Sequence, residues 1–183
     1  REIVLMAVSR HGIALLFASI DLRADREVVL TAVRQSGEAL RCVAPELRND
    51  REVVLAAVAQ DWAALQYASY ELRGDREIVL YAMTIDVEAF RFASDKLRRD
   101  RDVVLSAVIS FGHPLEHVAK ELRGDRDIVL AAVTWDGEHA LRYAPDELRR
   151  DEEILQAAAD AASEAPSTKN INPCLQDDMM YGR

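Results

Sequence analysis

The residues most able to bind a metal are His113 and His117 in the segment HPLEH. Two imidazoles at i and i+4 on one helix face can converge on zinc. However, Pro114 suggests that the helix begins there, which makes His113 a cap residue. His117 takes a repeat position held elsewhere by Phe17 and Tyr67, which favours a half-buried packing role. We therefore keep both histidines as candidate ligands of a metal or pigment, and expect no bound metal or cofactor.

Other catalytic patterns are missing from the sequence. Acidic residues recur along the chain, but as a row whose members would be separated by a helix layer of about 8–10 Å, too far for a shared proton. Ser19, Ser69 and Ser94 recur without a histidine–acid partner, and no glycine-rich phosphate loop occurs. We expect the protein not to be an enzyme.

Composition limits the class of protein and its partners. Of 183 residues, 50% are hydrophobic and 30% charged, which is typical of a packed fold. A net charge of −9 argues against nucleic-acid binding, which requires a basic surface. Cys42 and Cys174 form no disulfide framework, so we expect an intracellular, reducing compartment or an organelle interior. No apolar run approaches the roughly 20 residues of a membrane span, so any membrane contact would be indirect.

The chain is a tandem repeat. A block of the type REVVLAAV begins at residues 1, 26, 51, 76, 101 and 126, and a partial seventh copy begins near residue 152. Each block is followed by a second one of the type ALxYASxELR. The period is 25 residues, except that the sixth repeat carries one extra residue, most simply His139. Such periods are typical of solenoids. Positions are numbered 1–25 within a repeat, counted from Arg1.

Both blocks have helical spacing. Positions 3, 4, 5, 7 and 8 are apolar in the first block and positions 14, 15, 18 and 22 in the second. Aspartates such as Asp25 precede each first block and are good N-caps. The sequence predicts an all-α solenoid of about six and a half two-helix repeats over residues 1–163, with an extended C-terminal arm over 164–183. The alternative is a strand-plus-helix horseshoe, favoured only by the β-branched residues.

The repeat D-R-E-x-V-L-x-A-V…G-x-A-L-x-x-A-S/P-x-x-L-R resembles a tandem family known as a domain of unknown function, found in many copies per protein in protists and algae. The resemblance covers residues 1 to about 156. It implies an all-helical repeat protein and no activity that could be transferred. The departures Pro114 and His139 suggest a distorted junction between the fifth and sixth repeats.

Arginines recur at the corner between repeats. Because acids balance them locally, we expect a ladder of ion pairs with the Asp25-type and Glu46-type acids of adjoining repeats, rather than an anion-binding row.

The first repeat carries an unusual apolar stripe. Positions 13, 16 and 20 are mostly polar in other repeats, and here they are Ile13, Leu16 and Ile20, with Phe17 beside them. At helical spacing these positions project outward, so something should cover them. Three occupants remain open: a preceding repeat or N-terminal segment, since a chain without an initial methionine suggests a fragment; a partner protein; or a lipid surface.

Two further sets of apolar residues lie at variable positions. On the first helices of later repeats we expect an aromatic-rich partner-binding patch, unless the C-terminal arm packs over it. Its members are Tyr81, Ile85, Ile109, Phe111 and Trp135. The arm itself is apolar enough to dock on its own solenoid or on a neighbour. Its docking residues would be Ile171, Leu175, Met179, Met180 and Tyr181.

The sequence as a whole favours a non-catalytic scaffold, an accessory subunit that binds other proteins in a larger assembly such as an organellar one. The alternatives are a free-standing adaptor that binds short peptides and, more remotely, a module that ligates a metal or pigment.

Overall fold

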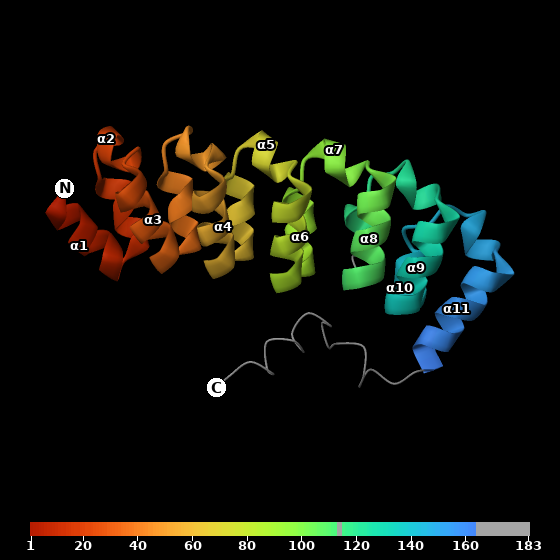
Figure 1. Ribbon diagram of the computed structural model, residues 1–183. Coiled ribbons are helices and arrows are strands. Elements are labelled where there is room, and N and C mark those ends of the chain that lie inside the picture. The colour runs from red at the N-terminus through yellow and green to blue at the C-terminus, as the bar shows by residue number, and fades with distance from the viewer. Residues whose placement is uncertain (113–114, 164–183) are drawn as a thin grey trace, which may run out of the picture. The chain divides into compact units, whose positions relative to one another are not determined.

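The structure is a computed structural model that describes residues 1–112 and 115–163 (Figure 1). Every regular element among these residues is an α-helix or a 3-10 helix (η), and none is a strand. The expected all-α repeat fold is therefore confirmed, and the strand-plus-helix alternative is wrong for the described residues. The chain separates into an N-terminal part, Arg1–Ser94, and a C-terminal part, Asp95–Arg183, each described by itself.

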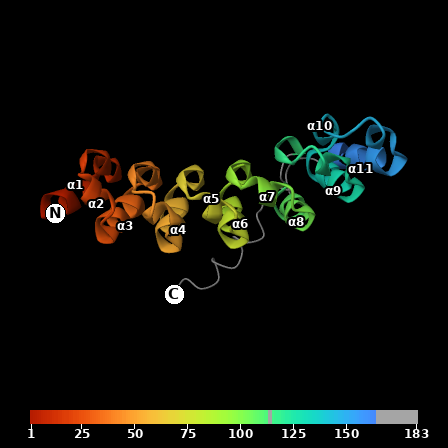
Figure 2. The same ribbon diagram turned by 90° about the horizontal axis from the view of Figure 1, so that it is seen from above.

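In the N-terminal part, each repeat begins with a long α-helix. The elements are α1 (Glu2–Arg10), η1 (Gly12–Phe17), α2 (Ile20–Arg23), α3 (Arg26–Gln35), η2 (Gly37–Cys42), η3 (Leu47–Asn49), α4 (Arg51–Gln60), η4 (Trp62–Tyr67), α5 (Tyr70–Arg73), α6 (Arg76–Ile85) and η5 (Val87–Phe92). The long helices α1, α3, α4 and α6 pack in sequence as one layer, and η1, η2, η4 and η5 form a second layer beside them (Figure 2).

The core of the N-terminal part lies between these layers. Leu40, Leu65 and Phe90, from η2, η4 and η5, are fully buried. Positions 3 and 4 of α3, α4 and α6 are buried too, as in Val28 and Val29. Burial of this repeated set from both layers is what stabilises each repeat against the next.

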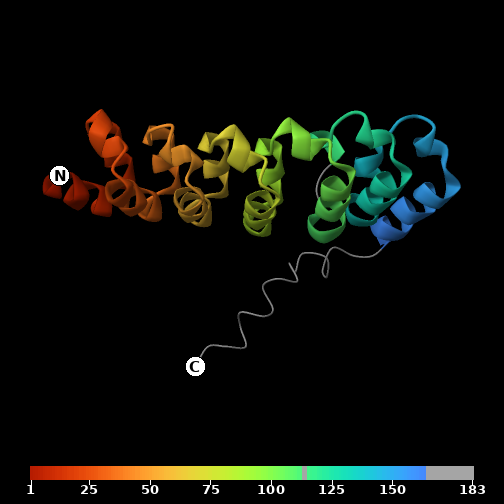
Figure 3. The ribbon, with the colours of Figure 1, turned by 45° about the horizontal axis from the view of Figure 1, so that its top comes forward.

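The C-terminal part follows the same pattern. Its elements are α7 (Asp95–Arg98), α8 (Arg101–Phe111), η6 (Leu115–His117), η7 (Leu122–Gly124), α9 (Arg126–Asp136), α10 (Glu138–Leu141), η8 (Leu148–Arg150) and α11 (Glu152–Ser163). Helix α9 packs between α8 and α11, and the short corner segments follow one edge of the layer of long helices (Figure 3).

The second half of each repeat is not the single α-helix that we expected. In repeats 1–4 a six-residue 3-10 helix ends at position 17, positions 18 and 19 are extended, and a separate short turn follows, as in the first repeat. The extended residues serve a contact between repeats, since the N–H at position 19 donates to the carbonyl at position 23 of the repeat before. Ser69 N lies 2.9 Å from Arg48 O in this way, and Ala44 N lies 3.0 Å from Arg23 O. A continuous helix would forfeit these bonds.

Capping follows the sequence prediction. Asp25 Oδ1 accepts hydrogen bonds from Glu27 N at 3.1 Å and Val28 N at 3.2 Å, and the aspartates before α4 and α6 do the same. These bonds satisfy two of the amides left unpaired at the start of each helix.

The sixth repeat, which carries the extra residue, departs from the pattern of repeats 1–4. Residue 139 lies in α10, a short α-helix that replaces the six-residue 3-10 helix of repeats 1–4. The chain enters α10 through Gly137, whose φ of 53° is left-handed and suits glycine.

Candidate interaction surfaces

An arginine ladder joins successive repeats. Arg1 Nε lies 2.7 Å from Asp25 Oδ2, and the same guanidinium also bonds Glu27. Equivalent pairs are Arg26 with Asp50 at 2.9 Å and with Glu52 at 2.5 Å, Arg101 with Asp125 at 2.7 Å, and Arg126 with Asp151 at 3.0 Å. Each arginine thus clamps the first turn of the next long helix.

Of the two kinds of acid expected to pair with these arginines, one is confirmed and the other was wrong. Asp25-type acids take part, but among the described residues Glu46 forms no ion pair, and the second acid is the Glu27 type at position 2. The reason is geometric, because the capping aspartate and position 2 share the first turn of one helix. The bond from Arg1 lowers the pKa of Asp25 to about 2, with help from the backbone amide of Val28.

The first repeat exposes a face that later repeats bury. Position 3 lies on the side of each long helix that faces the preceding repeat, and it is 84% exposed in Ile3 but fully buried in Val28, Val53 and Ile78. Ala7 is exposed while Ala32, Ala57 and Ala82 are buried. On the opposite side of α1, Val8 is buried against α3. No helix in the described ranges 1–112 and 115–163 therefore covers this face of α1.

Phe17 belongs to this same face. Its position reaches toward the preceding repeat, as shown by the stacking of Phe92 on Trp62, with ring centroids 5.9 Å apart, and by the bond of 2.8 Å from Tyr143 Oη to Glu116. In those repeats the aromatic ring is half-buried, whereas Phe17 is 87% exposed. Among the described residues no repeat packs on this side of Phe17, which accounts for its exposure.

The predicted outward stripe is partly as expected. Leu16 and Ile20 are exposed, at 44% and 74%, and their positions are exposed in the other described repeats too. Ile13 is half-buried, because position 13 lies at the base of the 3-10 helix. We define the N-terminal surface as the strongly exposed apolar side chains of the first repeat. Its residues are Ile3, Met6, Leu16, Phe17 and Ile20. Sequence reasoning missed Ile3 and Met6, since their positions are buried or variable elsewhere.

The second predicted patch is divided between the two parts. Tyr81 and Ile85 are exposed on α6 of the N-terminal part. In the C-terminal part, Trp135 Nε1 donates to Ile109 O at 3.2 Å, so these two residues are neighbours, and Phe111 is half-buried. The ring of Trp135 would lie 2.9 Å from a Cβ at Gly112, so glycine there leaves room for it.

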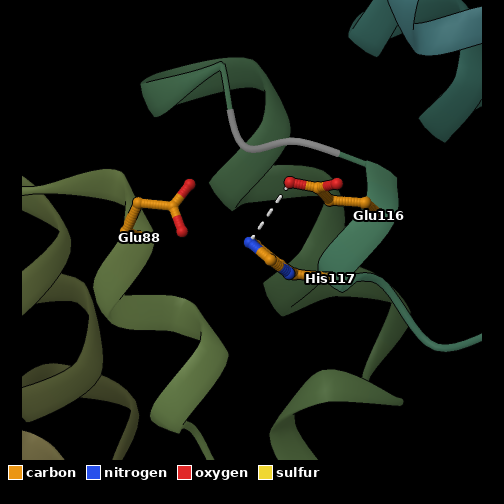
Figure 4. A group of neighbouring side chains, drawn as sticks. All are labelled: Glu88, Glu116 and His117. Carbon is orange, nitrogen blue, oxygen red and sulfur yellow. Dashed lines mark ion pairs between the residues drawn. The ribbon is translucent and has the colours of Figure 1, made fainter.

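His117 has the half-buried position expected for packing. Its Nε2 lies 3.6 Å from Glu116 Oε1, and both residues come from η6 (Figure 4). Glu88, also drawn in Figure 4, belongs to η5 of the N-terminal part. Adjacent residues of one turn supply only part of a tetrahedral site. His113 and the proposed arm, with Ile171, Leu175, Met179, Met180 and Tyr181, lie outside the described residues.

The repeats agree with a known family model. Segments 1–48, 50–98, 100–149 and 125–160 match the family described as "Domain of unknown function (DUF4116)". The chain belongs to the DUF4116 family. Each of the first three matches spans about two of the 25-residue repeats, so the family domain corresponds to a pair of them. No curated protein and no solved structure matches the chain. In the part of the chain that the structure describes, no helix is both long enough and apolar enough to cross a membrane.

Proposed function

We propose that this DUF4116 protein is a non-catalytic scaffold, an accessory subunit that is held in a larger assembly through its N-terminal surface. One observation carries the proposal: Leu16 and Ile20 are apolar at positions that are exposed in every described repeat, and Ile3 and Phe17 of the same repeat are 84% and 87% exposed. Several strongly exposed apolar side chains within one repeat are typical of a surface that binds another protein.

The internal copies indicate the chemistry of the partner. Wherever this face is covered within the N-terminal part, a long helix covers it, and an arginine of that helix pairs with the acids of the covered one. On α1 the exposed acid at position 2 is Glu2. We therefore expect the partner to present a helix with an apolar face and an arginine that can reach Glu2.

A second copy of this chain is a less suitable partner. The last described helix, α11, carries Glu152 at the arginine position and Gln156 at the leucine position. Stacked on α1, it would bring Glu152 toward Glu2, and two like charges repel. The charge pattern favours a different chain over head-to-tail polymerisation.

The test is the native mass of the protein in a gentle extract of its own cells, compared with that of variants. We expect the unaltered chain to migrate in a large complex, and Ile3→Glu with Phe17→Glu to release it, with helicity and melting temperature unchanged. Leu155→Glu on α11 is the matched control, because Leu155 is equally apolar and 44% exposed. Migration of the unaltered protein at the mass of a single chain would refute the proposal.

A further inference from the structure

The arginines at position 23 adopt two states. In repeats 2 and 5, where position 19 is alanine, the arginine turns back onto its own repeat. Arg48 Nε donates to Val43 O at 2.8 Å and its Nη2 to Arg41 O at 2.7 Å, and Arg123 makes the equivalent bonds. In repeats 1, 3 and 4 position 19 is serine, the corner is α-helical, and the Nε of the arginine is buried without a partner. Those arginines are Arg23, Arg73 and Arg98.

A pocket lies where a corner of the serine kind is followed by one of the alanine kind. Between repeats 1 and 2 its volume is about 310 Å³, and it is lined by Ile20, Arg23, Arg41, Val43, Pro45 and Arg48. The C-terminal part has the equivalent pocket, of about 330 Å³, between α7 and η7, lined at the same positions by Asp95, Arg98, Glu116, Val118, Lys120 and Arg123. The two pockets share one architecture and differ in their side chains.

The charge of the two pockets is different. In the C-terminal pocket, carboxylates accompany the cations, and Asp95 bonds Arg98. In the N-terminal pocket Ile20 replaces that aspartate and Arg41 replaces Glu116, so three arginines line it without any carboxylate. Arg41 pairs with Glu38 at 2.9 Å outside the lining, but neither Arg23 nor Arg48 forms an ion pair with a described residue.

The arginines of the N-terminal pocket have donors to spare. A guanidinium has five N–H groups. Arg48 uses two of its nitrogens for carbonyl oxygens, and the side chain of Arg23 has no hydrogen bond to a described residue. A guanidinium pair suits planar, two-oxygen anions, and Ile20, Val43 and Pro45 form an apolar wall beside the arginines.

We propose that this pocket binds the carboxylate of an acidic peptide, an aspartate or glutamate flanked by apolar residues. The apolar wall fits the flanking side chains, and Glu38 beside Arg41 would repel a doubly charged phosphate more than a singly charged carboxylate. The peptide is part of the protein that covers the N-terminal surface, because Ile20 belongs to both. The assignment therefore rests on the proposed function.

The experiment titrates the full chain with a short amidated peptide that has one glutamate between two leucines, and follows the Nε–Hε signal of Arg23 by ¹⁵N NMR. The matched probe has glutamine in place of glutamate, and inorganic phosphate is a third probe. We expect saturable shifts with the glutamate peptide that weaken in high salt. Binding should fall about tenfold or more in Arg23→Gln. It should also fall in Ile20→Asp, because the new carboxylate would pair with Arg23 as Asp95 pairs with Arg98 in the C-terminal pocket. Arg98→Gln, the equivalent change in the other pocket, should bind normally.

Equal binding of the glutamine peptide, or unchanged binding by Ile20→Asp, would overturn the site. Tighter binding of phosphate than of the glutamate peptide would overturn the ligand class. If Arg23→Gln does not fold, Ile20→Asp alone still tests whether the pocket binds a carboxylate. Because the probes need no partner, the site can fail while the native mass still supports the scaffold, and the scaffold can fail while the peptide still binds.

Discussion

At the scale of single residues, the Asp25-type aspartates have two roles. Each caps a helix by accepting two backbone amides and also receives the arginine of the repeat before, so helix start and repeat stacking depend on one carboxylate. These pairs are largely exposed, and exposed pairs contribute little to stability individually. They instead fix the register between successive repeats, since a slip of one residue would break both the cap bonds and the ion pairs at every repeat.

This arrangement predicts a dependence of stability on pH. The pKa of Asp25 is lowered to about 2, and the pKa values of Asp50, Asp125 and Asp151 are also lowered, chiefly by their arginines. A carboxylate with a lowered pKa in the folded state stabilises the fold above its unfolded pKa of about 3.9 and loses that effect as pH falls toward the folded value. The melting temperature should therefore drop between about pH 4 and pH 2.

The control for this prediction is Arg26→Gln, which removes the main cause of the shift at Asp50. NMR titration should then show the pKa of Asp50 moving up toward its ordinary value, while Asp125 keeps its lowered pKa. A titration of Asp50 that does not change would mean that the ladder is absent in solution.

At the scale of elements, the first half of each repeat was predictable and the second half was not. Apolar spacing and the capping aspartates define the long helices locally, so α3, α4 and α6 start where the sequence indicates. The 3-10 helix and the extended position 19 depend on hydrogen bonds to the preceding repeat, such as Ser69 N to Arg48 O, and periodicity within one repeat carries no information about them.

The glycine at position 12 lies where neighbouring repeats approach each other closely. A Cβ at Gly37 would lie 2.4 Å from the carbonyl oxygen of Ala57, in the backbone of the next long helix. We expect Gly37→Ala to lower the free energy of unfolding by about 1–3 kcal/mol, because the two repeats must move apart. Urea unfolding measures this change.

Gly124→Ala is the matched control, since a Cβ there meets no atom within 4 Å. It should be neutral or stabilise by up to about 1 kcal/mol through the unfolded chain. Similar losses in the two variants would contradict the packing described for the N-terminal part.

At the scale of the whole molecule, comparing equivalent positions of the repeats shows which apolar side chains no described residue covers. The apolar character of Ile13, Leu16 and Ile20 was evident from the sequence, but the direction in which position 17 points was not. Helical periodicity predicts which residues share a face. Only the packing of the later repeats shows that positions 3 and 17 lie on the side of a repeat that contacts the repeat before it. The same comparison of copies distinguishes the cationic pocket near Arg23 from its charge-balanced counterpart.

The central claim, that another protein covers the N-terminal surface, is tested most directly by hydroxyl-radical footprinting. Met6 and Phe17 are exposed in the isolated chain and react readily, and Tyr70, exposed on α5, serves as the internal reference. In a native extract we predict that Met6 and Phe17 become protected relative to the purified chain while Tyr70 keeps its reactivity. Equal labelling of Met6 and Phe17 in the extract and in the purified protein would contradict the account.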